Sequence, residues 1–139
     1  MIVLDTNVVS EMMKAERDRR VVAWLRRHPA DAIFTTTVNV AEILSGVGFL
    51  PAGRRQDDMR AIAVEIFERV FRDRILPFDR AAADAYAEIL PARRRMGRPI
   101  KEIDAEIAAI SRTHGMALAT RDFEDFSDCG VDVINPWSA

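Results

Sequence analysis

Hydrophobic and polar positions follow two different periods along this chain. Short apolar runs rich in β-branched residues, bounded by turn residues, predict strands. Five such runs occur, at residues 2–4, 32–35, 75–76, 116–119 and 131–134. Between them, apolar residues recur every three or four positions, which predicts helices at 8–13, 17–28, 38–46, 52–72, 80–96 and 101–113.

Strands that alternate with helical segments are typical of βαβ units. The pattern therefore predicts an α/β fold of three layers, in which helices flank a parallel sheet of four or five strands. The chain has 139 residues, enough for one domain that buries a continuous core, and we expect that domain to span residues 1–139.

Composition narrows the class of protein. Hydrophobic residues make up 49% and charged residues 30%, as in an ordinary globular protein. No apolar run approaches the roughly 18 residues of a membrane span. The N-terminus has no basic region before its apolar run, which argues against a secretory signal. Cys129 is the only cysteine, so a reducing cytoplasm is the expected location, with no membrane partner.

The net charge of −2 argues against non-specific coating of nucleic acid. Nearly all cations are Arg, a good phosphate ligand, but a genome that favours Arg codons is the preferred explanation. The triplet at 93–95 is interpreted as a solvated surface, or alternatively as a contact surface for RNA or a partner.

Four acids stand where a predicted strand ends or a predicted helix begins. Each has a purely structural alternative. Asp5 and Asp122 follow strands and are placed to cap helices. Glu42 follows Asn39 at capping-box spacing, and Asp104 lies in a first helical turn, where the helix dipole favours a carboxylate.

The four acids together indicate more than capping. Parallel strands share one carboxyl edge, and ligands bind in the crevice outside it. Asp5, Glu42, Asp104 and Asp122 are all expected at that edge. Carboxylates that converge repel one another unless a cation joins them, and oxygen ligands without nearby Cys or His favour Mg²⁺, with Mn²⁺ as a substitute.

The motifs that carry these acids resemble those of the PIN-domain family. They are LDTNVVSE with Asp5, VNVAEILSG with Glu42, DAEIAAI with Asp104 and LATRDFEDF with Asp122. More narrowly, the chain resembles the toxin ribonucleases of VapBC-type toxin–antitoxin pairs, especially their FitB-like branch. The resemblance extends over nearly the whole chain, to the NPW at 135–137.

The resemblance implies a metal-dependent endoribonuclease in which Asp5, Glu42, Asp104 and Asp122 are the catalytic and metal-binding acids. It also implies a homodimer and an inhibitory antitoxin with a DNA-binding domain, which forms a hetero-oligomer with the toxin. The apolar stripe of the 52–72 helix would supply a groove for an antitoxin helix or a dimer contact. Many relatives have Asn where this chain has Asp122, and their last acid stands at the position of Asp125.

Asp125 is therefore an alternative fourth acid or an outer-shell group. Thr6, Asn7 and Ser10 are expected to orient Asp5 or metal-bound water, although turn and capping roles suit them equally. Arg121 and Arg80 are candidate contacts for the RNA backbone, with exposed salt bridges as the alternative.

Two other functions fit parts of the pattern. One is a Mg²⁺-dependent phosphatase, but DTNVV lacks the second Asp of the D-x-D nucleophile motif. The other is a PIN-like binding module that retains the acids without catalysis.

Overall fold

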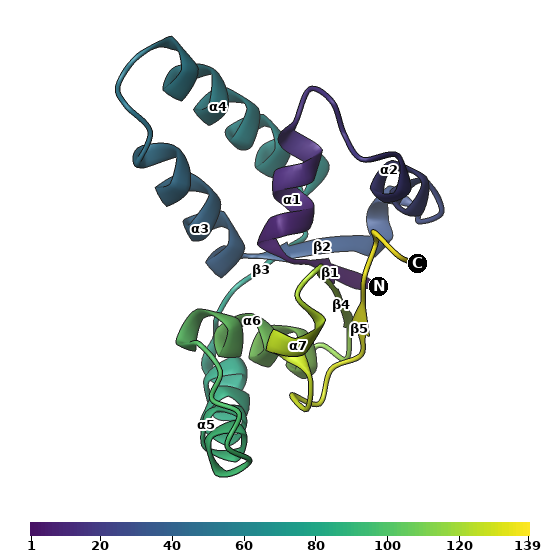
Figure 1. The fold of residues 1–139 in the computed structure, drawn as a ribbon, viewed down its shortest axis with the longest axis vertical. Coiled ribbons are helices and arrows are strands. Elements are labelled where there is room, and N and C mark those ends of the chain that lie inside the picture. The colour runs from purple at the N-terminus through teal and green to yellow at the C-terminus, as the bar shows by residue number, and fades with distance from the viewer.

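A parallel sheet of five strands forms the centre of the computed structural model, which describes all of residues 1–139 (Figure 1). The order of strands across the sheet is β3-β2-β1-β4-β5, and every pairing is parallel. The predicted α/β fold with a parallel sheet is therefore confirmed. The strands are β1 Ile2–Leu4, β2 Ile33–Thr36, β3 Ile75–Leu76, β4 Ala117–Ala119 and β5 Val133–Ile134.

Helices cover both faces of the sheet and make the three predicted layers (Figure 1). One face carries α1 Thr6–Met13, α2 Arg19–Arg26, α3 Thr37–Gly48 and α4 Arg54–Glu65. The other carries α5 Arg80–Arg95, α6 Glu102–Thr113 and α7 Phe123–Phe126.

The central strand β1 shows why the sheet is buried on both sides. Ile2 and Leu4 pack into the core below α1–α4, whereas Val3 packs into the core formed with α5 and α6. Successive side chains of a strand point to opposite faces, so an unbroken apolar run is what a doubly covered strand requires.

The segment predicted as one helix at 52–72 has two parts. Helix α4 ends at Glu65 and continues as a π-helical segment, Ile66–Val70. Ala63 and Phe67 are buried, while Ile62, Val64 and Val70 remain 38–39% exposed. The apolar stripe is thus wider than the core needs.

The short helix α7 and the burial of Arg93 were not predicted. A helix of four residues is too short to display a hydrophobic period. Arg93 was predicted on a solvated surface and is instead 3% exposed, whereas Arg94 and Arg95 are exposed as expected. No helix of the fold is both long enough and apolar enough to cross a membrane.

The strand order places one crevice at the middle of the sheet. After β1 the chain moves outward through β2 and β3, then returns to β4 on the other side of β1. The order therefore reverses between β1 and β4, and ligands of such sheets bind beyond the carboxyl ends of the strands at that point. Asp5 directly follows β1, and the segment 120–122 directly follows β4.

Burial on α6 provides a test of the core. Ile107 is fully buried, so we expect Ile107→Ala to lower the free energy of unfolding by about 2–5 kcal/mol. Ile62 is 39% exposed, and the same substitution there should cost only about 0.5 kcal/mol. Urea unfolding of the two variants measures both values, and equal losses would contradict this assignment of the core.

Candidate active site

Asp5 lies at the carboxyl end of β1 and is 5% exposed. Its backbone N–H donates to the carbonyl of Ala119 (2.9 Å), which fixes its position next to β4. Its carboxylate accepts hydrogen bonds from the Thr120 hydroxyl (2.7 Å) and from the Asn39 side-chain amide (3.2 Å). Although Asp5 occupies the N-cap position of α1, its side chain makes no capping bond. The capping alternative therefore does not account for this side chain.

Burial raises the pKa of Asp5, because an ionised carboxylate loses its hydration there. The hydrogen bonds from Thr120 and the Thr6 backbone act against this effect, and the neighbouring charges of Glu42 and Asp122 add to it. Asp5 is thus a carboxylate whose ionised form depends on donors or cations close to it.

Glu42 reaches the same place from α3. Its Oε1 accepts a hydrogen bond from the Thr6 hydroxyl (2.7 Å), which itself accepts one from the Asn39 amide (2.9 Å). The spacing of Asn39 and Glu42 suggested that these two residues form a capping box, but the box at the start of α3 is formed by Thr36 and Asn39. This leaves Glu42 free to face Thr6.

Asp122 is connected to Asp5 through Thr120 and Asn7. The Asn7 amide donates to Oδ2 of Asp122 and to the Thr120 hydroxyl, each at 3.1 Å. The same hydroxyl accepts the backbone N–H of Asp122 (3.1 Å). Like Asp5, Asp122 occupies an N-cap position without a side-chain capping bond.

Asp104 lies in the first turn of α6, as predicted, and is half-buried. Burial is the main cause that raises its pKa from 3.8 to about 6, and the charges of Asp5, Asp125 and Glu42 raise it further. The positive charge of Lys101 lowers the pKa of Asp104 but offsets only part of this increase. The charges of these three acidic neighbours act on Asp104, so the carboxylates repel one another in the absence of a cation.

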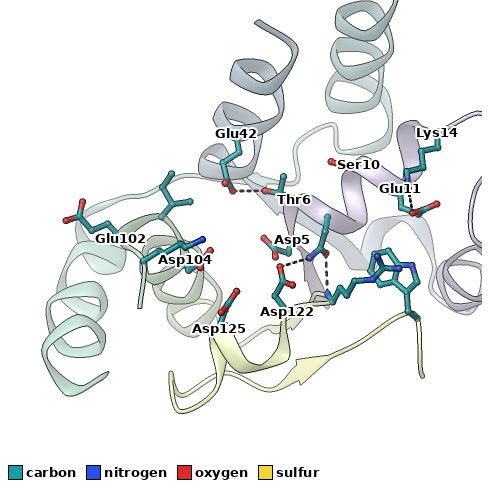
Figure 2. A pocket seen from close by; sticks show the side chains of 15 residues that line it. Asp5, Thr6, Ser10, Glu11, Lys14, Glu42, Glu102, Asp104, Asp122 and Asp125 are labelled. Atoms are coloured by element: carbon teal, nitrogen blue, oxygen red, sulfur yellow. Dashed lines mark hydrogen bonds and ion pairs between the residues drawn. The ribbon is translucent and has the colours of Figure 1, made fainter. Parts of the chain in front are cut away.

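All of these acids line one open groove of about 940 Å³ (Figure 2). Seven carboxylates line it, but only three cationic side chains, Lys14, Lys101 and Arg121. The seven are Asp5, Glu11, Glu42, Glu102, Asp104, Asp122 and Asp125. Excess negative charge in a concave site attracts cations.

The remaining predicted residues divide between the groove and the surface. Ser10 and Asp125 line the groove, as does Arg121, whose guanidinium lies 4.0 Å from the ring centroid of Trp137. Arg80 lies outside it and pairs with Asp84 on the exposed face of α5.

Sequence reasoning missed two buried partners, Asn39 and Thr120. Both are fully buried, and both donate to Asp5. A polar residue adjoining a predicted apolar strand was a usable signal at Thr120. Glu11 was also missed; its carboxylate accepts from the Asp18 backbone and from Lys14 at the groove wall.

The chemistry of these side chains fits a hard divalent cation. The candidate donors are carboxylate oxygens, with no His or Cys lining the groove. In the side-chain positions of this structure, no three of the acidic, His or Cys residues are arranged to hold one ion. A cation bound among these acids would offset the contribution that the charges of Asp5, Asp125 and Glu42 make to the raised pKa of Asp104.

The pKa of Asp104 gives a test in metal-free protein. Because folding raises this pKa, the folded state binds the proton more tightly than the unfolded chain does. The contribution of Asp104 therefore favours folding at about pH 4 and is lost as the pH rises through about 6. Asparagine does not titrate, so Asp104→Asn lacks this loss. Its free energy of unfolding should therefore increase relative to that of wild type as the pH rises from about 4 to about 6.

Chemical unfolding in EDTA between these pH values measures the difference. Asp31→Asn, an exposed acid outside the groove, is the matched control. Parallel pH profiles for wild type and Asp104→Asn would contradict the proposed environment of Asp104.

Comparisons with known proteins agree with this geometry. Residues 2–130 match the PIN domain family. The chain is 39% identical to VapC ribonuclease Y4jK of Sinorhizobium fredii, over 99% of this chain and 98% of that protein. It is 36% identical to Toxin FitB of Neisseria gonorrhoeae, over 99% of both chains.

A solved structure of FitAB bound to an IR36 DNA fragment contains a chain with the same fold. The TM-score is 0.91 at 37% sequence identity, over 99% of this chain and 96% of that one. The family match, the near-complete alignments and the shared fold all agree with the resemblance seen in the motifs. The chain therefore belongs to the PIN-domain family, in the branch that includes VapC ribonuclease Y4jK and Toxin FitB.

Proposed function

We propose that this protein is a Mg²⁺-dependent endoribonuclease that acts as the toxin of a toxin–antitoxin pair. The observation that carries the proposal is the convergence of Asp5, Glu42, Asp104 and Asp122 on one groove. The names of two relatives, a VapC ribonuclease and a toxin, support both halves of it. RNA is the proposed substrate, and the cytoplasm the proposed location.

Asp5 and Asp104 are the proposed principal ligands, with Asp122 and Glu42 completing the set and Asp125 as the alternative to Asp122. The Asp5 carboxylate accepts side-chain hydrogen bonds from Asn39 and Thr120 and a backbone hydrogen bond from Thr6. A carboxylate has about four acceptor sites, which leaves capacity for a cation. Bound Mg²⁺, or Mn²⁺ in its place, would supply a water of lowered pKa and neutralise charge on a phosphate.

The chain's own residues keep the acids in place for this chemistry. Thr120 and Asn39 orient Asp5, Thr6 orients Glu42, and Asn7 orients Asp122. These hydrogen bonds come from neutral donors, so they fix the carboxylates without cancelling their charge. The groove therefore keeps its attraction for a cation while its walls stay ordered.

Features at the rim suit a phosphodiester substrate. Helices α1 and α6 begin at the groove, and helix N-termini favour anions. Arg121 is held against Trp137, so less conformational entropy is lost when its guanidinium binds a phosphate. Lys14 and Lys101 add positive charge on two other parts of the rim.

A cognate antitoxin with a DNA-binding domain is the proposed inhibitor. A second hollow of about 270 Å³ shares Thr6, Ser10 and Glu42 with the acidic groove. Its other side chains are mostly apolar and include Met13, Ile43, Val47, Leu50 and Met59. An antitoxin segment that fills this hollow would also cover the acids. The solved FitAB structure on DNA supports such a partner.

A homodimer that combines with the antitoxin into a hetero-oligomer completes the proposal. The partly exposed apolar residues Ile62, Val64 and Val70 offer a surface for such contacts.

Growth and RNA cleavage test the catalytic role of the acids. Induced expression of the wild type should arrest growth, and Asp5→Asn should abolish the arrest. We expect RNA cleavage by the purified variant to fall more than about 100-fold, because even outer-shell partners of metal ligands cost about 10–100-fold.

Asp31→Asn keeps the groove intact and should remain toxic. Full toxicity of the Asp5→Asn, Asp104→Asn double variant would refute the proposal. A single-stranded DNA of the same sequence, offered in parallel, decides whether RNA is preferred.

Thermal and chemical unfolding test the metal site directly. Mn²⁺ at about 100 times its dissociation constant should raise the free energy of unfolding by about 2.7 kcal/mol, because only the folded chain forms the site. EDTA should reverse the increase, and the double variant should not show it. If Mn²⁺ has no effect on wild type near neutral pH, the protein is a binding module rather than a metal-dependent nuclease.

A further inference from the structure

The segment 122–130 carries two of the groove acids, Asp122 and Asp125, but has little regular structure of its own. Its helix α7 has four residues, too few to be stable in isolation. Asp128 adopts a positive φ of 58°, which costs energy for a residue other than glycine. Something outside the segment must therefore hold it in place.

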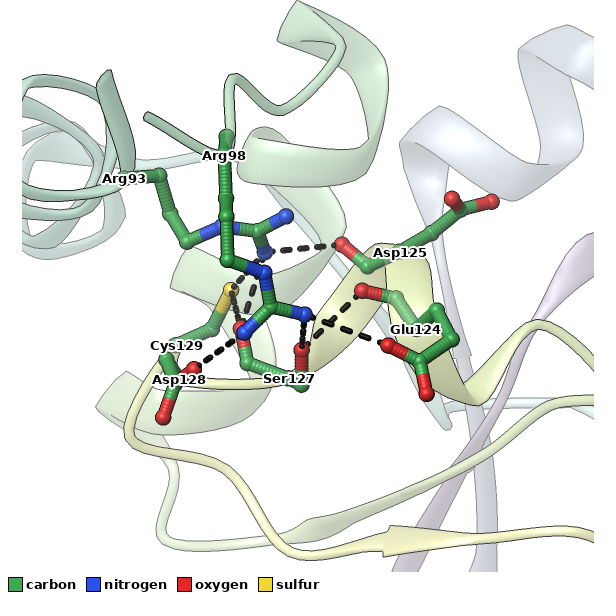
Figure 3. A network of polar contacts seen from close by, with 7 residues as sticks. All are labelled: Arg93, Arg98, Glu124, Asp125, Ser127, Asp128 and Cys129. Atoms are coloured by element: carbon green, nitrogen blue, oxygen red, sulfur yellow. Dashed lines mark hydrogen bonds and ion pairs between the residues drawn. The ribbon is translucent and has the colours of Figure 1, made fainter. Parts of the chain in front are cut away.

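Arg93 of α5 contacts this segment through its guanidinium (Figure 3). Its Nη1 donates to the backbone carbonyls of Asp125 (3.0 Å) and Ser127 (2.8 Å). It also lies 3.4 Å from the sulfur of Cys129. These carbonyls are at the C-terminal end of α7, where a helix leaves its acceptors without partners and where positive charge is favourable.

Arg98 holds the same segment from the outer side. Its guanidinium donates to Asp128 (2.6 Å), to Glu124 (3.2 Å) and to the Ser127 hydroxyl (2.6 Å). Its carbonyl accepts the Nε–H of Arg93 (2.8 Å), which joins the two arginines. We refer to Arg93 and Arg98 together as the arginine clasp.

Burying the charged guanidinium of Arg93 carries a desolvation cost, which its hydrogen bonds must offset. The guanidinium of Arg93 is buried, and every oxygen that it contacts is a backbone carbonyl, not a carboxylate. A buried charge of this kind is tolerated only when its donors are well satisfied. One of its acceptors belongs to Asp125, the residue whose carboxylate lines the groove beside Asp104 (Figure 2).

We propose that Arg93 and Arg98 are positioning residues, which fix the segment 122–130 so that Asp122 and Asp125 face Asp104 across the groove. Arg93 acts through backbone carbonyls of the segment and Arg98 through its side chains. Neither arginine lines the groove. The inference rests on the proposed function in one respect, namely that the positioned acids hold a cation. The holding of the segment itself is independent of any activity.

Arg93→Lys in the full chain tests the proposal. Lysine keeps the charge but has no planar fork with which to reach all of the acceptors. Hydrogen–deuterium exchange should show amides of residues 122–130 exchanging about tenfold faster, the equivalent of one lost hydrogen bond to a charged group. The affinity for Mn²⁺, measured by calorimetry, should fall by about 10–100-fold.

Arg94→Lys, an exposed neighbour on α5, is the matched control and should change neither value. Arg98→Gln changes a half-exposed position and is the second test. It decides the proposal in the event that Arg93→Lys does not fold. Faster exchange confined to 122–130, together with weaker Mn²⁺ binding, supports the proposal. Unchanged exchange, or exchange raised evenly throughout the chain, would overturn it.

The two proposals fail in different ways. Wild-type protein that binds no Mn²⁺ refutes the metal site, while the exchange experiment still decides whether the clasp holds the segment. Normal Mn²⁺ affinity in a variant whose segment is loosened would show that the clasp does not position the acids.

Discussion

A carboxylate that is almost completely removed from solvent needs donors to remain ionised, and Asp5 receives them from Thr120 and Asn39 at 2.7 and 3.2 Å. The rigid, doubly covered strand β1 fixes its backbone, and the reversal of strand order beside it opens the crevice into which it faces. Without hydrogen-bond donors, burial would raise the pKa of Asp5 further and disfavour the charged form that binds metal. The rest of the groove is built outward from this arrangement.

Each donor to Asp5 has a second partner, which extends the network to the other acids. Asn39 also donates to Thr6, which donates to Glu42. Thr120 also accepts from Asn7, which donates to Asp122. These acids are therefore not independent ligands on separate elements, since hydrogen bonds through neutral side chains connect one to the next. Asp104 lies outside this network of hydrogen bonds. Burial is the main cause of its raised pKa, and the charges of Asp5, Asp125 and Glu42 add to it.

The sequence predicted the sheet and the edge at which the acids gather, because both follow from local patterns. An apolar run marks a doubly buried strand, and strands that run parallel end at the same edge. The partners of Asp5 could not be predicted in the same way. Asn39 and Thr120 are polar residues of the types that are common in turns and helix caps. What sets them apart is a hydrogen bond to Asp5, which lies 34 residues from Asn39 and 115 from Thr120 along the chain. The burial of Arg93 could not be predicted for the same reason. A triplet of arginines is typical of a surface, and Arg93 is buried only because a distant segment of the chain packs over it.

The hydrogen bond from Thr120 to Asp5 joins two residues that are 115 positions apart in the sequence. A protein made from its N-terminus presents Asp5, Asn39 and Glu42 to solvent well before Thr120 and Asp122 have been synthesised. Until then β1 lacks its neighbour β4, and one wall of the groove does not exist. The acidic groove is therefore complete only after Thr120 and Asp122 have been made, so a chain interrupted before them has the first acids of the groove but not its second wall.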